Sequence, residues 1–134
     1  MSIEDNKAIV RRWVEIVMGK ELESFSEVLA PDCVFHMMVG DISPEQYRQG
    51  IEAVYKSVVP FHVTIEDIFA EGDKVATRGT WGGIHRGELR GVPPTGNRFK
   101  VINTGIWKIS GGKLAEAWPT LDIANWDRQL EANE

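Results

Sequence analysis

The sequence predicts an α+β domain in which three N-terminal helices cover one side of a curved antiparallel sheet. Apolar residues recur at helical spacing up to about residue 58, and from His62 onward they recur at every second position. The second half also contains hairpin turns, of which Gly111-Gly112 is the clearest. A strongly bent sheet closed by helices encloses a cone-shaped cavity, and such cavities are the usual ligand sites of small domains.

Composition limits the class of protein. The 134 residues suit one domain, 1–134, with 43% hydrophobic and 26% charged residues, which is typical of a soluble globular chain. A net charge of -5 without a basic run argues against nucleic acid or an anionic membrane as a partner. The single Cys33 gives neither a disulfide nor a metal-ligand spacing, so we expect no metal. We find no targeting or membrane-spanning pattern and expect a cytoplasmic protein.

The first predicted helix runs from about residue 3 to Met18. Ser2 and Asp5 form a weak capping box before it, and Gly19 stops it. Its apolar positions are Val10, Trp13, Val14 and Val17.

Two further helices and a strand complete the first half of the chain. A short helix over Leu22–Leu29 is ended by Pro31, and a short strand, Cys33–His36, follows it. The third helix begins at Ser43-Pro44-Glu45-Gln46, which combines an N-cap serine, a proline at the first helical position and a capping-box glutamine. Pro60 comes just after its end. Its buried face consists of Tyr47, Ile51, Val54, Tyr55 and Val58.

The remaining strands follow from alternation and turn residues. His62–Ala70 and Val75–His85 are joined at Gly72-Asp73, and a rigid loop over Gly87–Gly96 leads to a strand over Phe99–Ile109. After Asp122, residues 123–130 form a short closing helix or a tail.

The turn at Gly72-Asp73 predicts that Asp67 lies opposite Arg78 as an ion pair. This pair is expected on a mostly apolar face formed by Val63, Ile65, Phe69, Ala76, Thr80 and Ile84.

The Gly111-Gly112 turn predicts the register of the last hairpin. With a two-residue loop Ser110 faces Lys113, and Trp107 then pairs with Glu116, Gly105 with Trp118 and Asn103 with Thr120. One face is then a cavity wall or an ordinary aromatic core, formed by Val101, Asn103, Gly105, Trp107, Glu116, Trp118, Thr120 and Asp122.

Several of these motifs together resemble a known family. They are the segments 71–78 (EGDKVATR), 81–89 (WGGIHRGEL), 91–96 (GVPPTG) and 112–118 (GKLAEAW), with Asp122 and Gln129-Leu130. In this combination the chain resembles the SnoaL-like polyketide cyclase (ester cyclase) family of the nuclear transport factor 2-like superfamily of cone-shaped α+β barrels. The resemblance covers essentially the whole chain and is densest from residue 71 onward.

The resemblance implies a cofactor-independent enzyme acting on a small apolar or polyketide-like substrate, and a homodimer by analogy. Asp122 matches the family's acidic residue after the Trp, and it would abstract a carbon-bound proton so that the carbanion closes a ring by aldol condensation. The expected substrate-binding residues are His36, Asn103, Trp118, Arg78, His85 and Trp13, and the donor to the enolate oxygen is sought among His36, Asn103, His85 and Arg78.

Each assignment has a structural alternative. Asp122 is also a suitable N-cap for the helix that follows it, and Arg78 is explained as the partner of Asp67. His36 and His85 have structural interpretations of equal or greater weight. Asn103 is an unusual residue for a strand interior, and its structural alternative is a hydrogen bond to a loop. The tryptophans are core or cavity wall.

Other functions on the same cone fold remain open. A limonene-type epoxide hydrolase would need a second Asp where Thr80 stands, and a ketosteroid-isomerase-like site would need a Tyr where Trp13 stands. A single-base isomerase or dehydratase remains open, and so does a non-catalytic module that binds an apolar metabolite.

Overall fold

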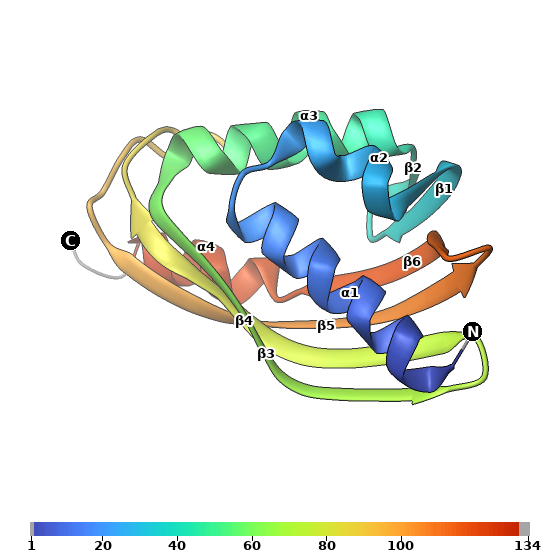
Figure 1. Cartoon of the computed structure of the whole chain (residues 1–134). Coiled ribbons are helices and arrows are strands. Elements are labelled where there is room, and N and C mark those ends of the chain that lie inside the picture. Colours follow the sequence, from blue (N-terminus) through green and yellow to red (C-terminus); the bar gives the residue numbers. More distant parts are fainter. Residues whose placement is uncertain (1, 132–134) are drawn as a thin grey trace.

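The computed structural model describes residues 2–131. Its strands form one curved sheet, and the helices lie on the concave side of that sheet (Figure 1). The elements in chain order are α1 (Ile3–Met18), η1 (Leu22–Ser24), α2 (Phe25–Val28), β1 (Leu29–Met37), β2 (Gly40–Ile42), α3 (Pro44–Ser57), β3 (Val58–Glu71), β4 (Lys74–His85), β5 (Arg98–Ser110), β6 (Lys113–Leu121) and α4 (Ile123–Glu131). The predicted α+β class is confirmed.

The predicted helix starts are also confirmed. The Ser2 hydroxyl accepts from the Asp5 amide at 3.0 Å, and the Ser43 hydroxyl accepts from the Gln46 amide at 3.2 Å, with the reciprocal side-chain bond present in both boxes. The residues that follow Asp122 form α4, which packs against β5. No helix in residues 2–131 is long and apolar enough to cross a membrane.

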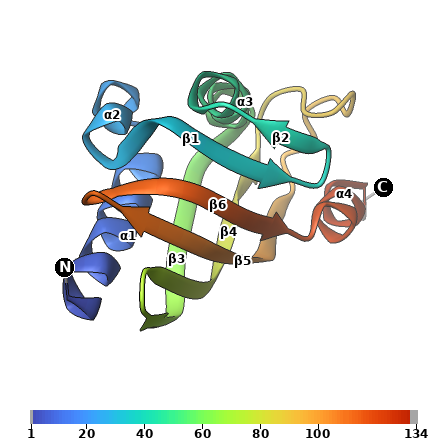
Figure 2. The same ribbon diagram turned by 90° about the vertical axis from the view of Figure 1, so that its right-hand side faces the viewer.

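The segment around Pro31 differs from the prediction. The second helix is a 3₁₀ turn and one α-helical turn that end at Val28, and strand β1 already begins at Leu29. Strand β1 pairs with β6 in parallel and with β2 in antiparallel orientation, so the sheet is mixed in the order β2-β1-β6-β5-β4-β3 (Figure 2). A proline is compatible with this strand because a bulge interrupts its pairing between Leu29 and Val34.

The predicted register of the β5–β6 hairpin was wrong from Lys108 onward. Ser110 does face Lys113, but a β-bulge shifts the ladder between Lys108 and Ile109, so that Trp107 lies opposite Ala117. A shift of one residue reverses the direction of every side chain. Strand β6 therefore presents Ala117, Pro119 and Leu121 to the concave face, whereas Glu116, Trp118 and Thr120 point to the convex face.

A second bulge, in β3, changes the surroundings of the predicted ion pair. Asp67 lies opposite Arg78 as expected, with 2.6 Å between the carboxylate and Nη2. The register shift between Ile65 and Asp67, however, places Val63 on the concave face and the ion pair on the convex face. The pair is therefore exposed to solvent, and such pairs stabilise little.

Candidate functional site

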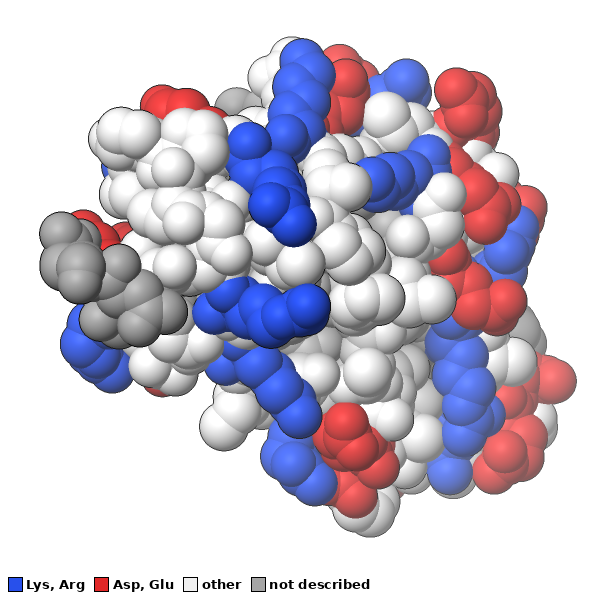
Figure 3. Space-filling view, turned by 90° about the vertical axis from the view of Figure 1, so that its left-hand side faces the viewer, with Lys and Arg blue, Asp and Glu red and all other residues white. Residues whose placement is uncertain are grey.

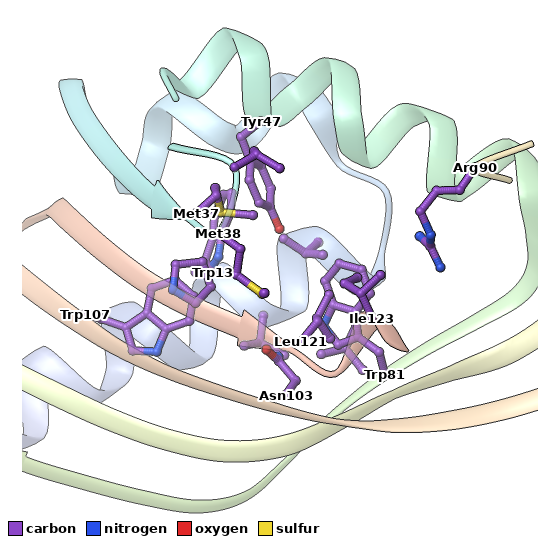
Figure 4. Close-up of a pocket in the computed structure, with 15 residues that line it drawn as sticks. Trp13, Met37, Met38, Tyr47, Trp81, Arg90, Asn103, Trp107, Leu121 and Ile123 are labelled. Atoms are coloured by element: carbon purple, nitrogen blue, oxygen red, sulfur yellow. The ribbon is translucent and has the colours of Figure 1, made fainter. Parts of the chain in front are cut away.

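A cavity of about 310 Å³ lies between the concave face of the sheet and the helices (Figure 4). Its walls come from α1, α3, the β1–β2 turn, strands β3 to β6 and the start of α4, and they are almost entirely apolar. The lining residues are Trp13, Val14, Val17, Met37, Met38, Val39, Tyr47, Val63, Trp81, Arg90, Asn103, Trp107, Pro119, Leu121 and Ile123. Its volume is within the range of small-molecule sites.

Trp107 forms one end of the cavity floor. Its indole lies over Gly105 on the same strand, where an added Cβ would come within 2.8 Å of the ring, and its Nε1 donates to the Thr77 hydroxyl at 3.0 Å. The predicted register paired Gly105 with Trp118, whereas in the structure Gly105 lies opposite Pro119 and makes room for Trp107. The glycine therefore helps to shape the cavity, through a contact within one strand.

Asn103 lies on the floor beside Trp81. When its amide is oriented to satisfy both groups, its oxygen accepts from the Trp81 Nε1 at 3.1 Å and its nitrogen donates to the Thr120 carbonyl at 3.3 Å. Trp81 is buried, so its N–H needs this acceptor. Asn103 therefore holds the indole in place on the cavity wall.

Tyr47 brings a hydroxyl group into the cavity from α3. Figure 4 shows its oxygen directed toward the centre of the space, and its ring stacks on Phe35 with centroids 4.4 Å apart. Burial raises the pKa of the Tyr47 phenol, so it stays a neutral donor at ordinary pH. Within residues 2–131, no group accepts a hydrogen bond from this hydroxyl.

Arg90 is the charged residue among those that line the cavity, and it reaches the rim from the β4–β5 loop. Its Nε and Nη2 donate to the same Asp127 oxygen at 2.9 and 2.6 Å. Its guanidinium carbon also lies 4.4 Å above the ring centroid of Trp126, a cation–π contact. Both partners belong to α4, so the loop and the helix are joined at this point.

Asp122 lies between two residues that line the cavity, Leu121 and Ile123, but it is itself exposed and outside the lining. Its Oδ1 accepts from the Asn125 amide at 3.0 Å, and its carbonyl accepts from the Trp126 amide at 3.0 Å. These are the bonds of an N-cap residue. The carboxylate thus caps α4 at the edge of the cavity.

His36 and Trp118 lie together on the convex face, away from the cavity. Their rings stack with centroids 5.0 Å apart. The His36 Nε2 lies 2.9 Å from a Glu116 oxygen, and its Nδ1 lies 2.7 Å from an Asp41 oxygen. The hydrogen bonds to Glu116 and Asp41, with their negative charges, raise the pKa of His36.

The other two predicted residues are also outside the cavity lining. Arg78 is on the convex face with Asp67. His85 is fully buried, and its Nδ1 accepts from the Thr95 amide at 3.2 Å, which joins the end of β4 to the far part of the β4–β5 loop. Of the seven residues expected to form the site, Trp13 and Asn103 line the cavity.

Sequence reasoning missed Tyr47 and Arg90. The prediction that Tyr47 lies on the buried face of a helix is correct, but within residues 2–131 this position gives its hydroxyl no hydrogen-bond partner. Arg90 was not singled out, because it lies in a turn-rich loop whose path over the cavity the sequence pattern does not determine. Within residues 2–131 no three His, Cys, Asp or Glu side chains are placed to hold a metal ion.

Comparison with known sequences identifies one family. The SnoaL-like polyketide cyclase family model matches residues 7–130. A stretch of 77 residues is also 30% identical to the iron-sulfur cluster assembly protein SufB of Bacillus subtilis (strain 168). That match covers 52% of this chain and 16% of SufB, so the chain spans a small part of that protein.

Solved structures with the same fold are numerous. AclR from Streptomyces galilaeus, a candidate hydroxylase, has a TM-score of 0.89 and 25% identity, with 98% of this chain and 83% of that chain covered. IdmH from Streptomyces antibioticus, a candidate polyketide cyclase, has a TM-score of 0.85 and 26% identity over 94% and 98%. A candidate SnoaL-like polyketide cyclase from Jannaschia sp. CCS1 has a TM-score of 0.90 over 100% and 97% at 19% identity, which is a likeness of fold.

Proposed function

Because this chain belongs to the SnoaL-like polyketide cyclase family, we propose that it binds a small, largely apolar, polyketide-like molecule in the cavity and closes a ring in it. The observation that carries the proposal is the cavity, whose apolar walls surround a few polar groups. Such a space favours a folded apolar substrate, and folding brings the reacting carbons together.

The proposed reaction is an intramolecular aldol condensation that uses no cofactor. A base removes an acidic proton from a carbon of the substrate, the resulting enolate attacks a carbonyl carbon of the same molecule, and the new alkoxide takes up a proton. One carbon–carbon bond forms, and no oxidant or reductant is needed.

In this proposal Asp122 is the base, as the family resemblance implies. Its position between Leu121 and Ile123 supports the assignment, since both neighbours line the cavity. The cap uses Oδ1, which leaves Oδ2 for a proton. We assign the donor to the enolate oxygen to the Tyr47 hydroxyl, because it points into the cavity as a neutral O–H group.

A second function, a non-catalytic module that binds an apolar metabolite, is favoured by one observation. Asp122 is exposed and makes the bonds of a helix cap, which explains a carboxylate at this position without chemistry. In that case the cavity would bind its ligand without converting it.

One experiment separates the two functions. Thermal stabilisation by a panel of polycyclic compounds and short polyketide methyl esters is measured for the wild type, Asp122→Asn and Tyr47→Phe, and turnover is followed by mass spectrometry. A compound that stabilises the wild type and Asp122→Asn equally, but is cyclised only by the wild type, supports Asp122 as the base. Binding without turnover by any of them supports the module, and the lack of any binding contradicts both functions.

A further inference from the structure

The cavity has a polar end that is built by three residues from two elements. Arg90 lies at the rim, far from Trp107 in Figure 4, and it is held from one side by the ring of Trp126 and from another by the carboxylate of Asp127. The rest of the lining consists of neutral residues. The cavity is therefore polar at one end and apolar along the remainder of its length.

The positive φ angle of Arg90 indicates that its side chain has a function. Leu89 and Val92 exchange both backbone hydrogen bonds around a two-residue turn, in which Arg90 and Gly91 have φ angles of 48° and 82°. Asn or Gly is favoured at the first of these positions, because other residues are strained at positive φ. An arginine kept in this conformation suggests a function for its guanidinium.

The pairing with Asp127 determines what the guanidinium can bind. Asp127 accepts hydrogen bonds from two of the five N–H groups of the Arg90 guanidinium. Within residues 2–131 the guanidinium makes no other hydrogen bond. The remaining donors can reach another acceptor, while the nearby carboxylate balances the charge. An uncharged carbonyl oxygen gains these hydrogen bonds, whereas a substrate carboxylate would be repelled by Asp127.

The acidic residue of the β4–β5 loop is the exposed Glu88, whose Oε1 accepts from the Gly91 amide at 3.3 Å, while the rest of the surrounding surface is largely basic. Figure 3 views the end of the molecule at which β4 connects to β5, and it shows Lys and Arg side chains gathered along the middle of that face. The exposed basic residues of the neighbouring segments are Lys56, Arg86, Arg98 and Lys100.

We propose that Arg90, positioned by Trp126 and Asp127, is the residue that orients the substrate, and that it selects an apolar molecule with an uncharged carbonyl group at one end. The carbonyl oxygen binds Arg90 at the rim, and the apolar part extends along the cavity toward Trp107. This inference rests on the proposed function, because it requires that the cavity binds a small apolar molecule.

Three naphthalene probes test the inference by calorimetry: 2-ethylnaphthalene, methyl 2-naphthoate and the 2-naphthoate anion. The wild type is expected to bind the ester about tenfold more tightly than the hydrocarbon, the size of one hydrogen bond to a charged donor. In Arg90→Met this preference falls below about twofold while the hydrocarbon still binds as before. In Asp127→Asn the naphthoate anion gains affinity, since its repulsion is removed.

Two further variants keep the test decisive. Arg90→Gly suits the positive φ of the turn and guards against misfolding of Arg90→Met, and Arg86→Met serves as the matched control because Arg86 is exposed and outside the cavity lining. An ester preference that persists in both Arg90 variants overturns the inference and leaves the proposed function intact. If the hydrocarbon and the ester both fail to bind the wild type, the binding cavity itself is wrong, and the inference is overturned with it.

Discussion

The Asp122 carboxylate accepts a hydrogen bond of 3.0 Å from the Asn125 amide and thereby caps α4. This helix carries Trp126, which packs on Phe99 with ring centroids 4.6 Å apart, and Asp127, which holds Arg90. The carboxylate that the family resemblance assigns to proton transfer thus also supports one side of the cavity.

Two substitutions of Asp122 separate these roles. Asn is as good an N-cap as Asp, so the free energy of unfolding of Asp122→Asn is expected to lie within about 0.5 kcal/mol of the wild-type value. Asp122→Ala is expected to lose about 1 kcal/mol of this free energy. Both lose cyclisation if the carboxylate is the base. Urea unfolding and turnover of the same samples check this, and full turnover by Asp122→Asn would contradict the assignment.

The contacts of His36 with the Glu116 and Asp41 carboxylates make the stability of the fold depend on pH. The hydrogen bonds to Glu116 and Asp41 raise the pKa of His36 in the folded protein, so these contacts stabilise the fold while the imidazole is protonated. That contribution is complete below the unfolded pKa of about 6.5 and is lost as the pH rises through the raised value. We expect His36→Gln to be most destabilising near about pH 5 and least near about pH 9.

Thermal unfolding across this pH range measures the effect of His36→Gln, with His62→Gln at the exposed His62 as the control. A destabilisation that is the same at every pH would mean that the charge of His36 contributes nothing, and that its stacking on Trp118 accounts for the loss.

Asn103→Leu is expected to leave the buried Trp81 N–H without an acceptor and to cost roughly 1–3 kcal/mol. The free energy of unfolding from denaturant titration checks this value. In a Trp81→Phe background the same substitution should cost less, since the unpaired donor is gone. Equal losses in the two backgrounds would show that Asn103 does not act through Trp81.

Gly105→Ala should displace Trp107, because the new Cβ would lie 2.8 Å from its ring. We expect a loss of roughly 1–3 kcal/mol, as for other overpacked sites, together with a change in tryptophan fluorescence. Gly50→Ala is the matched control, since an added Cβ on α3 meets no atom within 4 Å and should stabilise the helix by about 0.5–1 kcal/mol. Unchanged fluorescence in Gly105→Ala would contradict the contact.

The convex face supports the proposal of a homodimer. Phe69, Ala76, Ile106 and Trp118 lie in direct register across four strands, and Phe69 and Ile106 are 67% and 40% exposed. A face of this kind can pair with the same face of a second copy. We expect Phe69→Glu with Ile106→Glu to give a folded monomer in sedimentation experiments, whereas a wild type that is already monomeric would contradict the proposal.

Local rules account for what the sequence determined by itself. The capping boxes at Ser2 and Ser43, the turn after Ser110 and the change in apolar spacing depend on residues within a few positions of one another. They were enough to predict the starts of α1 and α3, the order of the strands along the chain apart from β2, and the α+β class. Two residues of the cavity lining, Trp13 and Asn103, followed from the same reasoning.

The tertiary structure decided which faces of the strands form the cavity. The register shifts next to Lys108 and Ile65 reversed the predicted directions of side chains in β6 and β3. In β6 this placed Trp118 on the convex face and Leu121 in the cavity. A bulge depends on the strands and helices that pack on both sides, and among these is the parallel pairing of β1 with β6, which joins distant segments. For the same reason only the folded chain brings Arg90 to Asp127, 37 residues away, and so gives the cavity its polar end.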